Sequence, residues 1–261
     1  MVIGYSLNSR TILCDVVNGS SLKKILICGA FHGLEGITSS FIEKFYNELL
    51  EKKIIPSASL YFVPCVNPDG VEISKNGPIS AGIYKELVEK IGFCDRWQAN
   101  ARGVDINHNF DANWDNLRKM EVQNGITGPS YTRYGGERAE SEPETQAIVN
   151  LCLREKFDIS IAFHSQGEEI YWNFDGIIPK HSEFLAKKMS EISGYSLSSP
   201  EGLAVGGGFK DWFIKKFNKP GFTIEIGKGK NPLPLSDLDS IYEKLRPMML
   251  DIVKNADEYL S

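Results

Sequence analysis

Cysteine is scarce in this sequence, with five residues among 261. They are odd in number and widely spaced, at Cys14, Cys28, Cys65, Cys94 and Cys152. A small secreted domain that disulfides hold together has a higher density of cysteines and an even number of them, so that class of protein is excluded. Most of these cysteines lie in apolar segments, which favours buried, reduced thiols and a cytoplasmic location.

Long hydrophobic runs and clusters of basic residues are also missing. No window approaches the roughly 18 continuous apolar residues of a membrane span, and residues 1–10 lack the basic and apolar regions of a signal peptide. The formal net charge is −5 at pH 7, without a prominent run of lysine and arginine. The sequence therefore predicts neither a membrane partner nor a nucleic-acid partner, and it leaves the oligomeric state open.

Apolar residues make up 42% of the chain, enough to fill one extended core, and we expect a single domain over residues 1–261. Strand-like apolar runs alternate with segments of helical periodicity. This alternation is typical of an α/β fold in which helices cover a mostly parallel sheet.

The periodicity places buried strands at 24–30, 59–64, 158–163 and 221–226, and helices at 37–53, 141–156, 180–193 and 237–259. Ser141 and Glu144 have the spacing of a capping box at a helix start. The segment Asn67-Pro68-Asp69-Gly70 predicts a tight turn. Residues 74–138 are rich in glycine, asparagine and aspartate and predict long functional loops.

Four metal-capable or acidic side chains follow or end these strands. His32 and Glu35 come after the first strand, His164 follows the third, and Glu225 lies in the fourth. Because ligands of open α/β sheets bind at the carboxyl ends of the strands, we expect the four side chains to converge in one crevice. Two imidazoles and one carboxylate are a ligand set of catalytic zinc, with a fourth position open to water.

Each of these assignments has a simpler alternative. A His-x-x-Glu pair such as His32 and Glu35 often occurs by chance around a structural histidine, although its position directly after a buried strand favours a metal. A carboxylate in a buried strand costs several kcal/mol unless it is paired. Glu225 is therefore either the partner of a nearby cation or a general base that takes a proton from metal-activated water and passes it to the leaving amine.

Five motifs occur in the order found in zinc metallocarboxypeptidases, and the chain resembles this family over nearly its whole length. They are Gly29-Ala30-Phe31-His32-Gly33-Leu34-Glu35, Asn67-Pro68-Asp69-Gly70, Gly103-Val104-Asp105-Ile106-Asn107, Phe163-His164-Ser165 and Phe222-Thr223-Ile224-Glu225. The resemblance implies a peptidase with one Zn²⁺ per chain and a mixed, mostly parallel sheet of about eight strands sandwiched by helices. It also implies that His32, Glu35 and His164 bind the zinc. Glu225 is then the catalytic carboxylate, and Asp105 orients His32.

Two segments resemble a narrower group, the bacterial γ-D-glutamyl-diamino acid peptidases: Gly167-Glu168-Glu169-Ile170-Tyr171-Trp172 and Glu225-Ile226-Gly227-Lys228-Gly229-Lys230-Asn231-Pro232-Leu233-Pro234. This likeness implies a short peptidoglycan peptide as the substrate, cut between γ-D-glutamate and diaminopimelate. Two rival functions remain open. One is a zinc amidohydrolase of acylated amino acids, as in the desuccinylase and aspartoacylase branch, and the other is a catalytically silent domain that binds wall peptides.

The sequence departs from the family at the residues that contact substrate. Where digestive-type members have Asn-Arg-Asn, with the arginine clamping the terminal carboxylate of the substrate, this chain has Asn107-His108-Asn109. We expect Asn107 and His108 to contact the substrate. A histidine does not form a permanent bidentate clamp, which argues against simple carboxypeptidase action.

The oxyanion arginine of the family usually follows a tryptophan, whereas Trp97 is followed by Gln98. Arg102 stands five positions after Trp97, and it is either the replacement oxyanion donor or an ordinary residue of a surface loop.

Counting back from Glu225 places Leu203 where the family has a mobile tyrosine, and it places Lys210 in the side-chain specificity pocket. A lysine there would attract the side-chain carboxylate of diaminopimelate; the alternative is an exposed lysine beside a glycine-rich loop. Arg133 and Arg138 lie in a loop rich in glycine and tyrosine, and either could hold a second substrate carboxylate.

Overall fold

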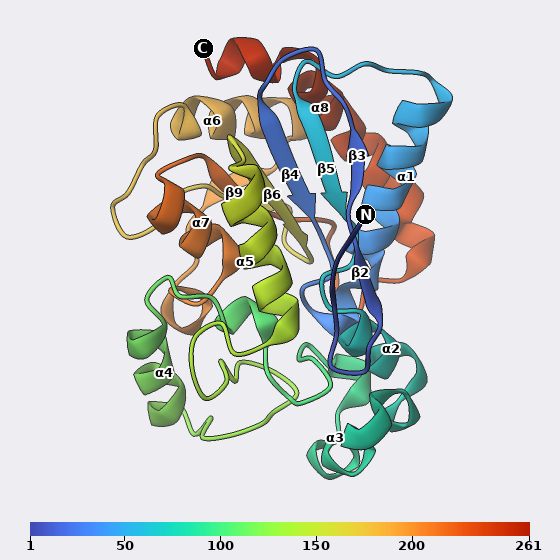
Figure 1. The fold of residues 1–261 in the computed structure, drawn as a ribbon, viewed down its shortest axis with the longest axis vertical. Coiled ribbons are helices and arrows are strands. Elements are labelled where there is room, and N and C mark those ends of the chain that lie inside the picture. The colour runs from blue at the N-terminus through green and yellow to red at the C-terminus, as the bar shows by residue number, and fades with distance from the viewer.

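A seven-stranded sheet lies between two layers of helices in the computed structural model, which describes all residues 1–261 (Figure 1). In spatial order the strands are β3 (Asp15–Val17), β5 (Ser59–Val63), β4 (Lys24–Cys28), β6 (Ile159–His164), β9 (Gly221–Glu225), β7 (Glu169–Tyr171) and β8 (Ser196–Ser198). Strands β5, β4, β6 and β9 run parallel, while β3 and β7 pair antiparallel with β5 and β9. The mixed, mostly parallel α/β sheet is confirmed, with seven strands instead of about eight.

The helices are α1 (Gly36–Glu51), α2 (Pro68–Asn76), α3 (Lys85–Ile91), α4 (Trp114–Gln123), α5 (Pro143–Glu155), α6 (Ser182–Ser193), α7 (Phe209–Phe217) and α8 (Leu238–Tyr259). Short 3₁₀ turns are η1 (Gly33–Glu35), η2 (Pro78–Tyr84), η3 (Cys94–Arg96), η4 (Ile106–His108), η5 (Gly202–Ala204) and η6 (Leu235–Asp237). A separate antiparallel ribbon, β1 (Val2–Tyr5) with β2 (Thr11–Leu13), packs beside α5.

The two faces of the sheet bury two separate cores, because successive side chains of a strand point to opposite faces. Ile25 and Ile27 of β4 join the core under α1, α6 and α8. Leu26 and Cys28 join the core under α5 and α7. All five cysteines are free, and three of them are buried, so the expectation of unpaired thiols agrees with the structure.

The helix and strand assignments made from periodicity hold to within a few residues, but two local assignments were wrong. Asn67 does not begin an isolated turn. Its side chain accepts from the backbone N–H of Gly70 at 2.9 Å and caps α2, so Pro68 begins a helix. Likewise Ser141 does not cap α5, because Glu142 occupies the cap position and the Ser141 hydroxyl donates to the Glu142 carboxylate.

Residues 74–138 contain α3, α4 and several 3₁₀ turns in addition to loops. A small apolar cluster that includes Ile73, Val88 and Trp97 holds the first part of this segment against α2. The loops between these helices bring Gln98, Asp105 and the residues around Arg133 to the carboxyl ends of the strands.

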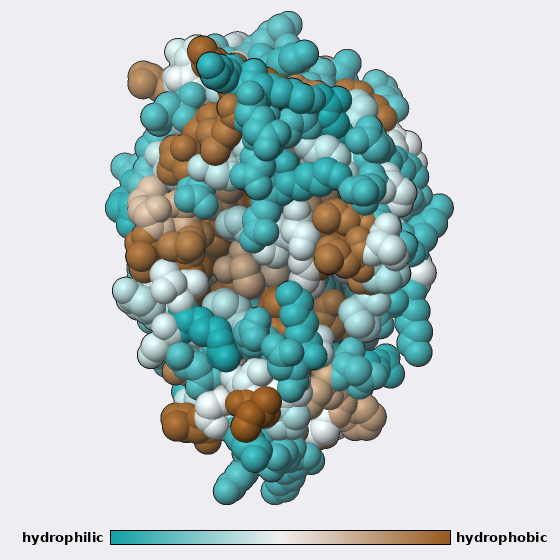
Figure 2. Space-filling view, turned by 90° about the vertical axis from the view of Figure 1, so that its right-hand side faces the viewer, coloured by the Kyte–Doolittle hydropathy of each residue, from teal (hydrophilic) through white to brown (hydrophobic).

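Figure 2 shows the surface on the right-hand side of Figure 1. This surface is mostly hydrophilic, and its hydrophobic side chains form scattered patches instead of one continuous area. None of the helices combines the length and the apolar content that crossing a lipid bilayer requires.

Candidate active site

Three predicted ligands meet at the carboxyl ends of two neighbouring strands. His32 follows β4 at the start of η1, Glu35 ends η1, and His164 is the last residue of β6. The Nδ1 atom of His32 lies 2.8 Å from one oxygen of Glu35, and the Nδ1 atom of His164 lies 3.0 Å from the other. The ligand atoms of the three residues all lie within 4.8 Å of one another, so the convergence expected from strand topology occurs.

The loop that carries His32 and Glu35 is held by close backbone packing. A side chain on Gly33 would place its Cβ atom 2.3 Å from the carbonyl oxygen of Gly70, so only glycine fits there. The Asn67 side chain donates to the carbonyls of Phe31 and Ala99, at 3.0 and 3.1 Å. The Asn67-Pro68-Asp69-Gly70 motif therefore acts as a support that fixes the ligand loop against the Gln98 loop.

Asp105 lies beside His32, as the family resemblance implied. One of its oxygens is 3.3 Å from the Nε2 atom of His32, and the other accepts the backbone N–H of Arg133 at 2.9 Å. Burial alone would raise the pKa of this carboxyl, but His32, His108 and the backbone donor outweigh it and hold the pKa below its usual range. A charged carboxylate here fixes the orientation of the His32 ring.

Glu225 ends β9 directly beside His164, because these two residues are register partners in the parallel pair β6–β9. Burial raises the pKa of Glu225 well above its ordinary value of 4.5, and the nearby Glu35 carboxylate raises it further. No lysine or arginine forms an ion pair with Glu225 in the structure, so the simpler alternative of a buried ion pair is not realised. A carboxyl group with a raised pKa next to three metal-capable side chains is suited to proton transfer.

Of the residues described so far, His32, Asp105, His164 and Glu225 line one cavity of about 210 Å³. Three predicted substrate contacts, Asn107, His108 and Lys210, also line it. Asn107 accepts the backbone N–H of Phe209 at 3.0 Å and so ties η4 to the start of α7. The Nδ1 atom of His108 is 2.8 Å from the buried Glu121 carboxylate, which fixes the direction of its ring.

Lys210 is 5% exposed, so it is not the freely solvated lysine of the simpler alternative. Its ammonium group donates to the carbonyl of Asn173 at 2.6 Å and lies 2.5 Å from the carboxylate of Asp211. Both charged groups line the cavity, and a buried cation beside a buried anion is costly unless the two stay paired or meet a ligand of matching charge.

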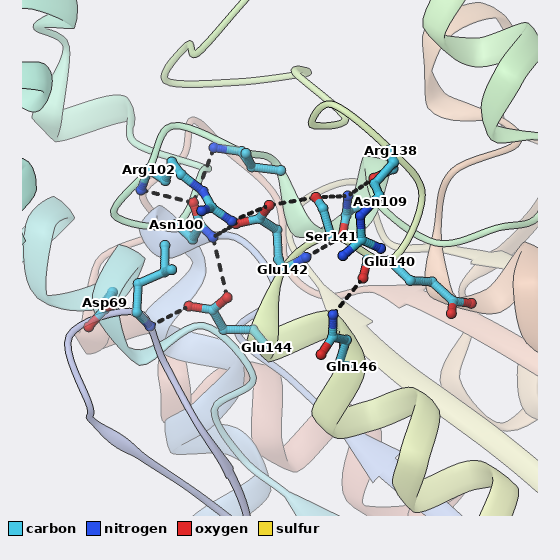
Figure 3. A network of polar contacts seen from close by, with 12 residues as sticks. Asp69, Asn100, Arg102, Asn109, Arg138, Glu140, Ser141, Glu142, Glu144 and Gln146 are labelled. Carbon is cyan, nitrogen blue, oxygen red and sulfur yellow. Dashed lines mark hydrogen bonds and ion pairs between the residues drawn. The ribbon is translucent and has the colours of Figure 1, made fainter.

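Arg102 and Arg138 do not reach this cavity. Both line a different one, together with Tyr134 and Ser141. Arg102 turns toward Glu142, and its Nη2 atom is 2.9 Å from that carboxylate (Figure 3). The structure therefore does not support the expected oxyanion role of Arg102 or the expected substrate contact of Arg138. The buried Glu142 carboxylate binds Arg102, and the loop that carries Arg138 places it in the wall of the other cavity.

Sequence reasoning assigned no role to two other polar side chains of the cavity, Gln98 and Tyr171. Thr132 donates to the Oε1 atom of Gln98, which leaves the amide N–H₂ group free to donate elsewhere. The hydroxyl group of Tyr171, on strand β7, donates to the Glu169 carboxylate at 2.7 Å. Glu169 is the register partner of Glu225 on β9. Leu203 also lines the cavity but offers no hydrogen-bond donor. Glu169 and Tyr171 are two residues apart on β7 and so point to the same face of the sheet, and this alternation is the sequence signal that could have placed Tyr171 in the site.

Two imidazole nitrogens and a carboxylate that converge on one point fit a mononuclear catalytic zinc, and Glu225 stands beside them as an acid or base. The fold and the site thus define a metal-dependent hydrolase built on an α/β sheet.

The model of the family described as "Zinc carboxypeptidase" matches residues 1–248. The chain belongs to that family and is a zinc metallopeptidase. It is 34% identical to the gamma-D-glutamyl-L-diamino acid endopeptidase 1 of Lysinibacillus sphaericus, over 93% of this chain and 64% of that protein. It is also 34% identical to the uncharacterized protein YqgT of Bacillus subtilis, over 92% of this chain and 68% of that protein. The chain thus spans about two thirds of the length of both relatives.

A solved structure of bovine thrombin-activatable fibrinolysis inhibitor, in complex with a tick carboxypeptidase inhibitor, superposes with a TM-score of 0.79 over 100% of this chain and 89% of that chain. At 21% sequence identity, this likeness shows the shared fold.

Proposed function

We propose that this protein hydrolyses the amide bond between γ-D-glutamate and diaminopimelate in short peptidoglycan peptides, with one zinc held by His32, Glu35 and His164. The observation that carries the proposal is the convergence of these three ligands beside Glu225 at the ends of β4, β6 and β9. The 34% identity to a γ-D-glutamyl-L-diamino acid endopeptidase supports the substrate class.

When bound, zinc polarises the scissile carbonyl and lowers the pKa of a water molecule. Glu225 takes a proton from the attacking water and returns it to the departing nitrogen, so that the C–N bond breaks to give a carboxylate and an amine. Its raised pKa suits both halves of this transfer. Asp105 keeps the His32 ring in place during the reaction.

The negative charge that develops on the carbonyl oxygen needs a donor other than Arg102. Gln98 lines the cavity, and its backbone carbonyl accepts the N–H of Gly33, next to His32. Because Thr132 occupies its Oε1 atom, the amide N–H₂ group of Gln98 is the donor that we assign to the oxyanion.

The leaving residue faces Asn107, His108 and Lys210. Diaminopimelate carries both a carboxylate and an ammonium group at the far end of its side chain. The adjacent Lys210 and Asp211 present one charge of each sign in the same cavity, which complements that end of the molecule.

The test is hydrolysis of L-Ala-γ-D-Glu-diaminopimelate, of an ordinary C-terminal dipeptide and of an acylated amino acid, followed by mass spectrometry on protein of measured zinc content. We expect cleavage of the first alone. Glu225→Gln should keep its zinc and lose activity by about 100-fold or more, since general acid–base catalysis contributes at least that much.

The matched control is Glu183→Gln, which changes a solvent-exposed glutamate on α6 and should cleave like the wild type. Cleavage of the acylated amino acid instead would favour an amidohydrolase. Tight peptide binding without any turnover would favour a silent binding domain.

A further inference from the structure

A second cavity, of about 480 Å³, adjoins the cavity that holds the metal ligands. The two cavities share Gln98 and Arg133 in their walls. Leu34, which lies between the ligands His32 and Glu35, lines the second cavity only. A substrate that crosses the metal site can therefore extend past Gln98 into this second space.

The second cavity is lined by three cations, Arg96, Arg133 and Lys230, and we call it the cationic groove. No aspartate or glutamate lines it, and none of the three cations forms an ion pair in the structure. Nearby Lys228, in contrast, is paired with Glu168 at 2.9 Å. In a chain of net charge −5, three unpaired cations in one groove favour an anionic ligand.

The backbone fixes Arg133 at the junction of the two cavities. Its N–H donates to Asp105 at 2.9 Å, and the N–H of Asp105 donates to the carbonyl of Tyr134 at 2.8 Å. Arg133 also has a φ of 62°, a left-handed conformation that side-chain-bearing residues seldom adopt without support. The same carboxylate that orients His32 thus holds the backbone of this arginine in position, while its side chain is exposed.

Lys210 lines the metal cavity but not the cationic groove, so the two cationic subsites lie on different sides of Gln98 and Arg133. If Lys210 faces the leaving residue, the groove is left for the acyl side of the scissile bond. An amide formed through the γ-carboxyl group of glutamate leaves the α-carboxylate free on that side, whereas an ordinary peptide bond uses the α-carboxyl group.

We infer that the cationic groove binds the free α-carboxylate of a γ-linked glutamyl residue and so makes the enzyme selective for acyl groups that carry a negative charge. This inference rests on the proposed function and adds to it a subsite for the acyl side.

The experiment compares two peptides that differ in one group: L-Ala-γ-D-Glu-diaminopimelate with a free α-carboxylate, and the same peptide with an α-carboxamide. We expect the wild type to prefer the carboxylate by at least about tenfold in kcat/KM, mainly through KM, as for a hydrogen bond to a charged group. In Arg133→Gln, and in the double variant Arg96→Gln with Lys230→Gln, this preference should fall to about onefold to threefold.

The control is Arg154→Gln. Arg154 is exposed, and its neighbour Glu155 pairs with Lys24 at the start of β4. Arg154 therefore lies near the amino ends of the strands, whereas the active site lies at their carboxyl ends. Arg154→Gln removes the same charge and should keep the wild-type preference. Equal use of both peptides by the wild type, or an equal loss of kcat for both peptides in Arg133→Gln, overturns the inference.

Binding separates this inference from the proposed function. Zinc-loaded Glu225→Gln is titrated with both peptides by calorimetry, with and without Arg133→Gln. If the wild type cleaves neither peptide, the proposed function fails, yet a tenfold preference for the carboxylate that Arg133→Gln removes still supports the groove. Equal affinity for both peptides, or no binding of either, overturns the groove even if other peptides are cleaved.

Discussion

The two walls of the active-site cavity differ in how they are built. One wall consists of strand ends and carries His164 on β6 and Glu225 on β9. The other consists of loops from the segment 74–138 and carries Gln98 and Arg133. The strand wall holds its residues through a continuous ladder of backbone hydrogen bonds, while the loop wall depends on individual side chains such as Asn67 and Asp105.

This difference explains why the loop wall could not be predicted residue by residue. A residue at the end of a parallel strand has its position set by the register of the sheet. A residue in a long loop is placed by whichever buried group it meets, and Arg102 meets Glu142 (Figure 3). Three experiments test whether the two walls differ in this way.

Loss of a strand-end ligand should have the largest effect. His164→Ala removes one of three ligands, so zinc should no longer stabilise the protein. A metal present at 1,000 times its dissociation constant raises the free energy of unfolding by about 4 kcal/mol. We expect a chelator to lower the Tm of the wild type but to leave that of His164→Ala unchanged, in thermal unfolding with measured zinc content.

His181→Asn is the control for this experiment. His181 lies at the start of α6 with a φ of 72°, which asparagine tolerates, and it is not part of the ligand group. A chelator should destabilise this variant as much as the wild type. If His164→Ala retains stoichiometric zinc and the same response to the chelator, the strand wall does not bind the metal as proposed.

Glu144 of α5, which contacts the segment 74–138 through Asn100, should give the protein a pH-dependent stability. This side chain is fully buried beside Asn100 and Glu142, and burial raises its pKa from 4.5 to about 7. Because the folded state holds its proton more tightly than the unfolded state, stability is greatest below about pH 4.5 and falls as the pH rises through 7. The difference between the two pKa values corresponds to about 3 kcal/mol.

Urea unfolding of the chelated protein at pH 5 and pH 8 measures this effect. Glu144→Gln carries no proton-dependent charge, so its loss of stability between these pH values should be smaller than that of the wild type by about 2 to 3 kcal/mol. Parallel pH profiles of the two proteins would show that Glu144 does not hold its proton in the folded state.

The last of the three experiments concerns the choice of oxyanion donor within the loop wall. Gln98→Ala should lower kcat by about 100-fold with little change in KM, as expected when one such donor is removed. Arg102→Gln should change kcat less than about threefold, because Arg102 lines another cavity. Steady-state kinetics below the unfolding temperature decides between them, and the reverse result would restore the role first expected of Arg102.

The α/β class, most long strands and helices, and the group His32, Glu35, His164 and Glu225 could be predicted from the amino-acid sequence. Periodicity reports which face of an element is buried, and parallel strands bring their carboxyl ends together whatever lies between them. Local capping was harder to read, because Ser141 and Asn67 each have competing partners along the chain.

Which loop residues face the cavity depends on how the chain packs in three dimensions. Gln98 enters it because the ligand loop packs on the Trp97–Gln98 backbone through Gly33. Arg102, four residues later, is drawn away by the buried Glu142. The choice depends on contacts between segments distant in sequence, and the free energy of burying a charge beside its partner is a property of the folded molecule that no local pattern records.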